Sequence, residues 1–249
     1  EGATSALSFA RQLNMLPIGV VAQAAGVAAF PFLARLAAQG DTMGLHRTTG
    51  RAARVTIFVS AAATALMVAV AEPLVRVLFA YGEFTTSDAT AVAGLLTIYA
   101  LAIPLWGIHQ IISRHFYAQG RMWLPVVIGT AALVPTIPMW IVGRANWGER
   151  GMAAASTLSM LIYAGALLGA WWKESGTGIA GSLFPTIVRS ALAGAAGALV
   201  GRAVTSSVFA TGDTVPVGIL AVIIGGGTAA VTFLLTALKH FITDEHRKA

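Results

Sequence analysis

Long apolar runs dominate this chain of 249 residues and constrain its fold more than any other feature. A helix that crosses a bilayer needs about 20 largely apolar residues. About seven runs reach this length, at roughly residues 8–34, 54–80, 88–118, 124–143, 151–172, 183–205 and 215–238. The pattern therefore predicts an all-α transmembrane protein, a polytopic helical bundle of about seven spans.

The charge content excludes a water-soluble domain of this size. Only 10% of the residues are charged and 57% are hydrophobic, whereas soluble domains have about 25% charged residues. The net charge is +6, but the basic residues are scattered between apolar runs, so nucleic acid is not an expected partner. The chain has no cysteine, which excludes disulfides, thiolate zinc sites and cysteine nucleophiles.

The distribution of Lys and Arg between the short loops predicts the orientation of the spans, because cytoplasmic loops are enriched in basic residues. One set of polar segments is strongly basic and contains Arg35, Arg47, Arg51, Arg54, Arg114, Arg121, Lys173, Lys239, Arg247 and Lys248. The opposite set mixes both signs and contains Arg76, Arg144, Arg150, Arg202, Glu83, Asp88, Glu149 and Asp213. We therefore expect the C-terminal tail and the loop from Arg35 to Arg54 in the cytoplasm, and residue 1 on the outer side.

The odd number of spans and the outer start lead us to expect a piece of a longer protein. The first residues, Glu1-Gly2-Ala3, are no initiator and follow no signal peptide. We expect the missing N-terminal part to contain at least one more span. Within the piece we expect one membrane domain without a soluble part.

Prolines are expected to interrupt three of the runs, since proline removes a helix hydrogen bond and clashes with the preceding turn. Pro17 interrupts the first run and Pro104 lies in the middle of the third. The fourth run contains Pro125, Pro135 and Pro138, so part of it is expected to be kinked or broken.

The first run is the most polar, with Arg11, Gln12 and Asn14 just before Pro17. A charged group inside a membrane has a high energetic cost, so its presence there indicates a specific role. One interpretation is a cationic wall for phosphate or pyrophosphate, because a guanidinium binds such oxygens bidentately. The alternative is that Arg11 extends to the outer interface, which its place near the start of the run permits.

The third run contains a second polar group. His109 and Gln110 lie deep in it and are interpreted either as a hydrogen bond to a neighbouring helix or as a proton relay. Arg114 lies near its cytoplasmic end, in a basic and aromatic cluster that is typical of a membrane interface. The alternative for Arg114 is a place on a transport path. His46 and Arg47, in the basic loop, are expected to be solvated.

The sequence contains no signature of catalysis. Gly197 and Gly201, and the run from Gly225 to Gly227, are interpreted as sites of close helix packing. The latter run is not a phosphate loop, because no Lys-Ser/Thr follows it and no strand precedes it. We expect no enzyme activity, no metal site and no cofactor.

Three segments in order resemble the MurJ/MviN family, the lipid II flippases of bacterial cell-wall synthesis, within the multidrug/oligosaccharidyl-lipid/polysaccharide exporter superfamily. The first runs from Ser5 through Arg11 to Gly19 and continues to Phe30-Pro31-Phe32-Leu33. The second is Val77 to Thr85, and the third is Arg114-His115-Phe116-Tyr117-Ala118 followed by Pro125. Gly148 to Ser159 is similar to the family's next small-residue stretch.

The resemblance implies a 14-helix flippase that works by alternating access, of which these spans would be the eighth to fourteenth. It implies a transport lobe at residues 1–175, and two additional membrane helices with a short cytoplasmic tail at residues 176–249. The expected partners are lipid II, a lipid-linked pyrophosphate precursor, the membrane lipids, and the missing N-terminal half. The expected location is the bacterial cytoplasmic membrane.

The candidate substrate-binding residues are Arg11, Gln12, Asn14 and Arg114. A family arginine that lines the central cavity corresponds in position to Gln12, with Arg11 one residue earlier, about 100° away around a helix. The alternatives are a related polysaccharide-lipid or multidrug exporter, and a membrane scaffold that organises cell-wall enzymes without transport. An intramembrane arginine beside a helix break favours transport over the scaffold.

Overall fold

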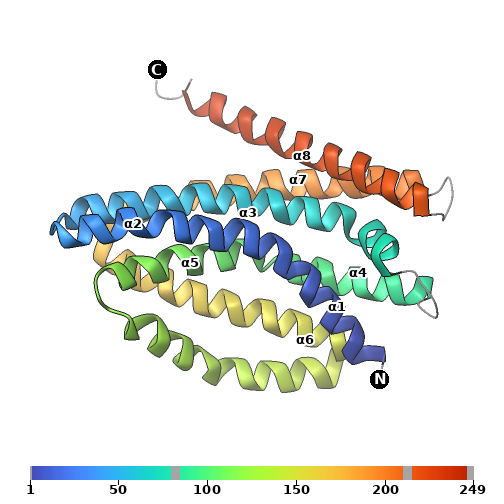
Figure 1. Cartoon of the computed structure of the whole chain (residues 1–249), viewed down its shortest axis with the longest axis horizontal. Coiled ribbons are helices and arrows are strands. Elements are labelled where there is room, and N and C mark those ends of the chain that lie inside the picture. Colours follow the sequence, from blue (N-terminus) through green and yellow to red (C-terminus); the bar gives the residue numbers. More distant parts are fainter. Residues whose placement is uncertain (1, 80–84, 210–214, 246–249) are drawn as a thin grey trace. The chain divides into compact units, whose positions relative to one another are not determined.

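The computed structural model describes residues 2–79, 85–209 and 215–245, and its described residues are almost entirely helical. The elements are α1 (Gly2–Pro17), the π-helix η1 (Ile18–Gln23), α2 (Ala24–Ala38), α3 (Thr42–Phe79), α4 (Thr86–Ala100), α5 (Ile103–Ala118), α6 (Trp123–Gly181), α7 (Leu183–Phe209) and α8 (Val215–Glu245). Figure 1 shows this order along the chain. Several positions used for orientation and motifs lie outside the described residues: Ala80 to Phe84, Asp213, Arg247, Lys248 and the side chain of Lys239.

Six helical segments of the described chain are long and apolar enough to cross a membrane. One of them, α6, is interrupted at Gly148, where φ is 55° and ψ is −129°. Residues 123–147 and 149–175 therefore form two arms that run antiparallel, as Figure 1 shows in green and yellow. With α6 counted as two crossings, the predicted bundle of about seven spans is confirmed.

Helix α3 begins earlier than the apolar run predicts. The loop from Arg35 to Arg54 was expected, but α3 begins at Thr42, so Arg47, Arg51 and Arg54 lie in the helix. Asp41 caps its first turn, because the backbone N–H of Gly44 donates to Asp41 Oδ1 at 2.8 Å. The prediction of a loop up to Arg54 was therefore wrong. Hydropathy indicates only the apolar part of a helix, and α3 continues beyond that part into polar residues.

Of the breaks expected at prolines, the one in the fourth run is absent, whereas the one in the third run is present. The backbone stays helical through Pro135 and Pro138, so the fourth run is not broken there. The third run is interrupted between α4 and α5, and Pro104 lies in the first turn of α5, where the missing N–H costs nothing. Glycine ends helices elsewhere, as at Gly40, whose φ of 70° closes α2.

The chain divides into two compact units. The first unit contains residues 1–13, 61–100 and 188–249, and the second contains residues 14–60 and 101–187. In the first unit the predicted close packing is confirmed at Gly197, Gly201, Gly225 and Gly226, but it is wrong for Gly227, where a Cβ would meet nothing within 4 Å. A Cβ at Gly197 would lie 2.7 Å from the carbonyl oxygen of Ala229, and one at Gly201 would lie 2.8 Å from that of Gly225.

The second unit has an aromatic and aliphatic core. Its largest fully buried side chains include Trp171 of α6 and Phe116 of α5, which belong to one cluster with Ile111, Ile112 and Leu167. The core therefore joins α5 to the second arm of α6. This packing fixes the orientation of α5, and with it the positions of its polar residues.

Candidate functional site

A π-helix follows Pro17 and confirms the predicted interruption of the first run. Proline cannot donate a hydrogen bond, and its ring clashes with the carbonyl four residues earlier in a regular α-helix. After Pro17 the backbone forms the wider π-helix η1, and the α-helical backbone begins again with α2 at Ala24. Such π-helical turns occur frequently at functional sites. Both η1 and α2 pack against α5, so the widened turn and Arg114 of α5 belong to one structural group.

Arg114 is partly buried against α2. Its side chain occupies the space that a side chain at Gly26 would need, because a Cβ there would lie 2.5 Å from Arg114 Nε. The guanidinium carbon lies 5.9 Å from the centre of the Phe30 ring, within the range of a cation–π interaction. Arg114 Nε is buried and has no hydrogen-bond partner among the described residues. A cation held in this way can still bind an anionic oxygen.

Several further buried polar atoms in the second unit lack a protein partner in the described structure, and two of them belong to Asn14 and His109, which the sequence singled out. Asn14 is 3% exposed and its Oδ1 accepts no hydrogen bond. His109 Nδ1 is buried without a partner, while its ring contacts those of Trp106 and Tyr163, with centroids 5.6 and 4.8 Å away. Buried polar atoms are nearly always satisfied, so atoms of this kind indicate contact with water or a ligand.

The four predicted site residues belong to different units of the structure. Arg11 and Gln12 are exposed and belong to the first unit, whereas Asn14 and Arg114 belong to the second. Within the described residues of the second unit, no hydrogen bond or ion pair joins Asn14 to Arg114. The role of all four in substrate binding stays a prediction.

Sequence reasoning missed a buried histidine cluster. His115 is fully buried, with Nδ1 2.8 Å from Thr49 Oγ1 and Nε2 3.2 Å from Gln119 Nε2. The ring of His46 lies 4.9 Å from that of His115 and also contacts Trp171. His46 was expected to be solvated, but it is partly buried and its Nδ1 is covered. The sequence does contain an indication of this cluster, because His46 and Thr49, and likewise His115 and Gln119, are spaced so that each pair lies on one face of a helix.

Near this cluster, polar contacts join the segment between α5 and α6 to α6, and α3 to the residue that follows α6. Arg121 Nη1 lies 2.5 Å from Glu174 Oε1, and the Arg121 guanidinium also lies 5.2 Å from the Phe116 ring centre. Arg54 donates to Ser182 Oγ at 2.6 Å. These contacts place basic residues at one end of the second unit and hold its helices together there.

Several helices that are long and apolar enough to cross a membrane, one of them interrupted by a π-helical turn, define a polytopic helical membrane protein. The sequence model described as "Lipid II flippase MurJ" matches residues 1–220. The chain belongs to this lipid II flippase family, whose members are integral membrane proteins.

Individual relatives support the same assignment. The chain is 27% identical over 169 residues to a probable lipid II flippase MurJ of Bdellovibrio bacteriovorus, covering 68% of this chain and 32% of that protein. It is 26% identical over 159 residues to one of Rhizobium meliloti, covering 64% and 30% respectively. The matches therefore extend over about a third of the length of these relatives.

A solved structure has the same fold. It is titled "Lipid II flippase MurJ, inward closed conformation" and superposes with a TM-score of 0.73 at 18% identity. The match covers 98% of this chain and 48% of that chain. The helical arrangement thus corresponds to about half of a flippase of this family.

Proposed function

We propose that this chain is the C-terminal half of a flippase that moves lipid II, a lipid-linked pyrophosphate precursor, across the bacterial cytoplasmic membrane. Alternating access would expose the head-group site to each side in turn. No bond is made or broken in this process, so the protein acts as a transporter and not as an enzyme. The other half of the transport path would come from the missing N-terminal part.

The observation that carries the proposal is Arg114, a cation partly buried beside a π-helical turn with Nε unpartnered among the described residues. In a site with little water, a guanidinium binds pyrophosphate oxygens through charge-assisted, bidentate hydrogen bonds. Asn14 would supply a further polar group from the end of α1. Arg11 and Gln12 would contribute from the preceding turn of the same helix.

The test is lipid II translocation by the intact protein in vesicles, with Arg114→Gln and Arg11→Gln compared with wild type. A hydrogen bond to a charged group contributes about 1.5–3 kcal/mol, so we expect each variant to lose roughly tenfold or more in head-group affinity. Arg114→Lys should recover only part of the loss, because an ammonium cannot bind bidentately.

Arg47→Gln is the matched control, since it removes an equally positive but exposed side chain from α3. It should translocate lipid II as wild type does. Unchanged translocation in both Arg114→Gln and Arg11→Gln would contradict the cationic site. If Arg114→Gln and Arg11→Gln instead lost the export of drugs or of polysaccharide lipids, the result would indicate the related exporter class.

The orientation proposed is a cytoplasmic C-terminus, with residues 1–175 as a transport lobe and residues 176–249 as two additional helices and a tail. Cysteine labelling tests it, since the chain has no cysteine of its own. Gln39→Cys and Ser87→Cys are suitable because both positions are exposed, whereas Thr49 is buried. Ser87→Cys should react from outside and Gln39→Cys from inside, and the reverse pattern would contradict the orientation.

A further inference from the structure

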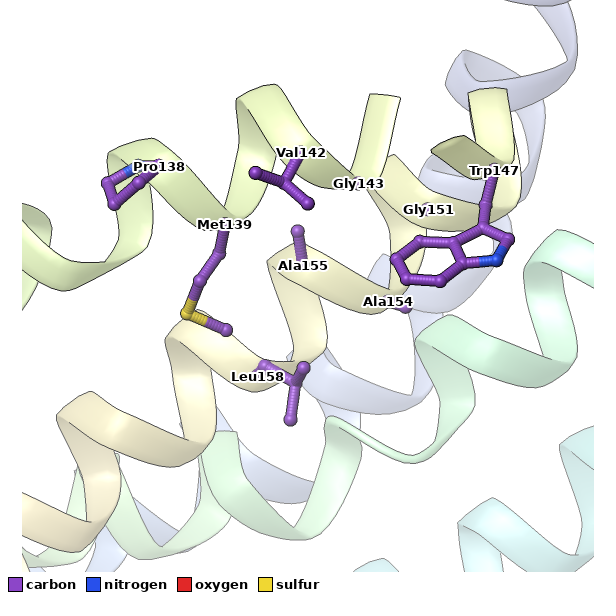
Figure 2. Close-up of a pocket in the computed structure, with 9 residues that line it drawn as sticks. All are labelled: Pro138, Met139, Val142, Gly143, Trp147, Gly151, Ala154, Ala155 and Leu158. Atoms are coloured by element: carbon purple, nitrogen blue, oxygen red, sulfur yellow. The ribbon is translucent and has the colours of Figure 1, made fainter. Parts of the chain in front are cut away.

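An apolar groove lies between the two arms of α6, and Figure 2 shows the side chains that line it. Its volume is about 350 Å³, which lies at the lower end of the range for small-molecule sites. The lining carries no charged side chain and consists of Pro138, Met139, Val142, Gly143, Trp147, Gly151, Ala154, Ala155 and Leu158.

Close approach of the arms at one end creates the groove. A Cβ at Gly143 would lie 2.7 Å from the carbonyl oxygen of Gly151, so the backbones touch where these glycines face each other. Beyond this contact the arms are separated by Met139 and Leu158, which stand on opposite arms in Figure 2. The result is an apolar groove between the arms, with Trp147 at the turn.

The turn beside the groove is positively charged. Arg144 directly follows the lining residue Gly143, and Arg150 directly precedes the lining residue Gly151. Both arginines are exposed, and no ion pair of either is found among the described residues. Glu149 is the one acidic residue of the turn, so the turn carries a net positive charge.

Trp147 strengthens the case for a membrane interface at this turn. It is 68% exposed although it is a large hydrophobic residue. Exposed tryptophans gather at the level of lipid head groups, where the indole ring contacts both chains and polar groups. An apolar groove beside a turn that carries two exposed arginines and an exposed tryptophan is complementary to a lipid with one buried chain and a negative head group.

We propose that the groove between the arms of α6 binds an anionic glycerophospholipid of the surrounding bilayer. One acyl chain would lie along Met139, Ala154 and Leu158, and the phosphate would be bound by Arg144 and Arg150 at the turn. The bound lipid would hold the two arms at their present spacing. This site is separate from Arg114 and does not depend on the proposed transport of lipid II.

The test is native mass spectrometry of the intact protein with two added lipids, phosphatidylglycerol and phosphatidylcholine, that have the same acyl chains. Wild type should retain phosphatidylglycerol in preference to phosphatidylcholine by about tenfold or more, because each basic residue near an anionic lipid contributes appreciably. The double variant Arg144→Gln with Arg150→Gln should lose most of this preference, and both substitutions lie at exposed positions of the turn.

Two further variants complete the experiment. Ala154→Leu fills the groove and should lower the retention of both lipids, while the charges at the turn stay in place. Arg202→Gln removes an exposed arginine from α7 and should leave the preference unchanged.

Equal retention of the two lipids by wild type would overturn the proposal. A preference that survives the double arginine variant would do the same. Displacement of the bound lipid by undecaprenyl pyrophosphate would assign the groove to the transported substrate, which also contradicts a bilayer phospholipid as occupant.

Discussion

Gly201 of α7 lies directly against Ala69 of α3, and a Cβ at position 201 would come within 2.7 Å of the Ala69 Cβ. The side chain of Thr205, one turn further along α7, reaches the same helix, with Oγ1 3.1 Å from the carbonyl oxygen of Ala69. Helices that pack in a membrane gain stability from such small residues and hydroxyl contacts, because lipid provides no hydrophobic force between helices.

The substitution Gly201→Ala should therefore destabilise the first unit. Inserted methyl groups in a packed contact cost about 1–3 kcal/mol, since the surrounding backbone must move apart. The matched control is Gly227→Ala on α8, where a Cβ meets nothing within 4 Å. Thermal unfolding in detergent should show a lower midpoint for Gly201→Ala only. Equal midpoints for the two variants would mean that the close contact is not stabilising.

Gly26→Ala should impair transport without unfolding the protein. The added methyl group would displace the guanidinium of Arg114, which is the flexible end of a side chain and can move at little cost to stability. Gly19→Ala in η1 is the control, because a Cβ there meets nothing within 4 Å. We expect slower lipid II translocation for Gly26→Ala and an unchanged rate for Gly19→Ala, with similar unfolding midpoints. A Gly26→Ala protein that transports normally would argue against a role for this position of Arg114.

Much of this fold could be predicted from the sequence, because a bilayer imposes a minimum length on every span. Within the described residues the apolar runs correspond to helices, and the interruptions of the first and third runs lie beside Pro17 and Pro104. The start of α3 could not be predicted in this way, since its first turns are polar and depend on the cap by Asp41. The form of the interruption, a π-helix and not an open turn, depends on the packing of η1 against α5.

The candidate site was predictable only in part. Arg114 could be singled out because a charge within an apolar run is unusual, but its contact with Gly26 joins residues far apart in the sequence. The contact between His115 and Thr49 also crosses 66 positions, and neither residue stands out by itself. Burial of a polar pair is decided by how helices pack, which the hydropathy of single runs does not report.

Thr49→Val should destabilise the second unit through His115. The hydroxyl of Thr49 lies 2.8 Å from His115 Nδ1 inside a buried region, and valine has a similar shape but cannot form this hydrogen bond. A buried polar atom left unsatisfied costs about 1–3 kcal/mol. Thr130→Val is the control, because the Thr130 hydroxyl is exposed and donates only to the carbonyl of Val126 in its own helix. Unfolding by denaturant should separate the two variants, and equal stability would contradict the importance of this pair.

Gly148→Ala should destabilise the turn between the arms of α6. Its φ of 55° and ψ of −129° lie in a region that residues with a Cβ rarely adopt, and such strain costs about 1–3 kcal/mol. Gly165 lies within the second arm with helical geometry and nothing within 4 Å of a Cβ, so Gly165→Ala should be neutral or slightly stabilising. Limited proteolysis near the turn should be faster for Gly148→Ala alone, and similar rates would show that the backbone adapts.

The turn at Gly148 also constrains how the two arms lie in the membrane. A single non-helical residue joins the arms, so the end of the first arm and the beginning of the second lie at the same depth in the membrane. The two arms therefore form one hairpin, in which the depth of one arm fixes the depth of the other. Arg144, Glu149 and Arg150 stay together at the turn of this hairpin.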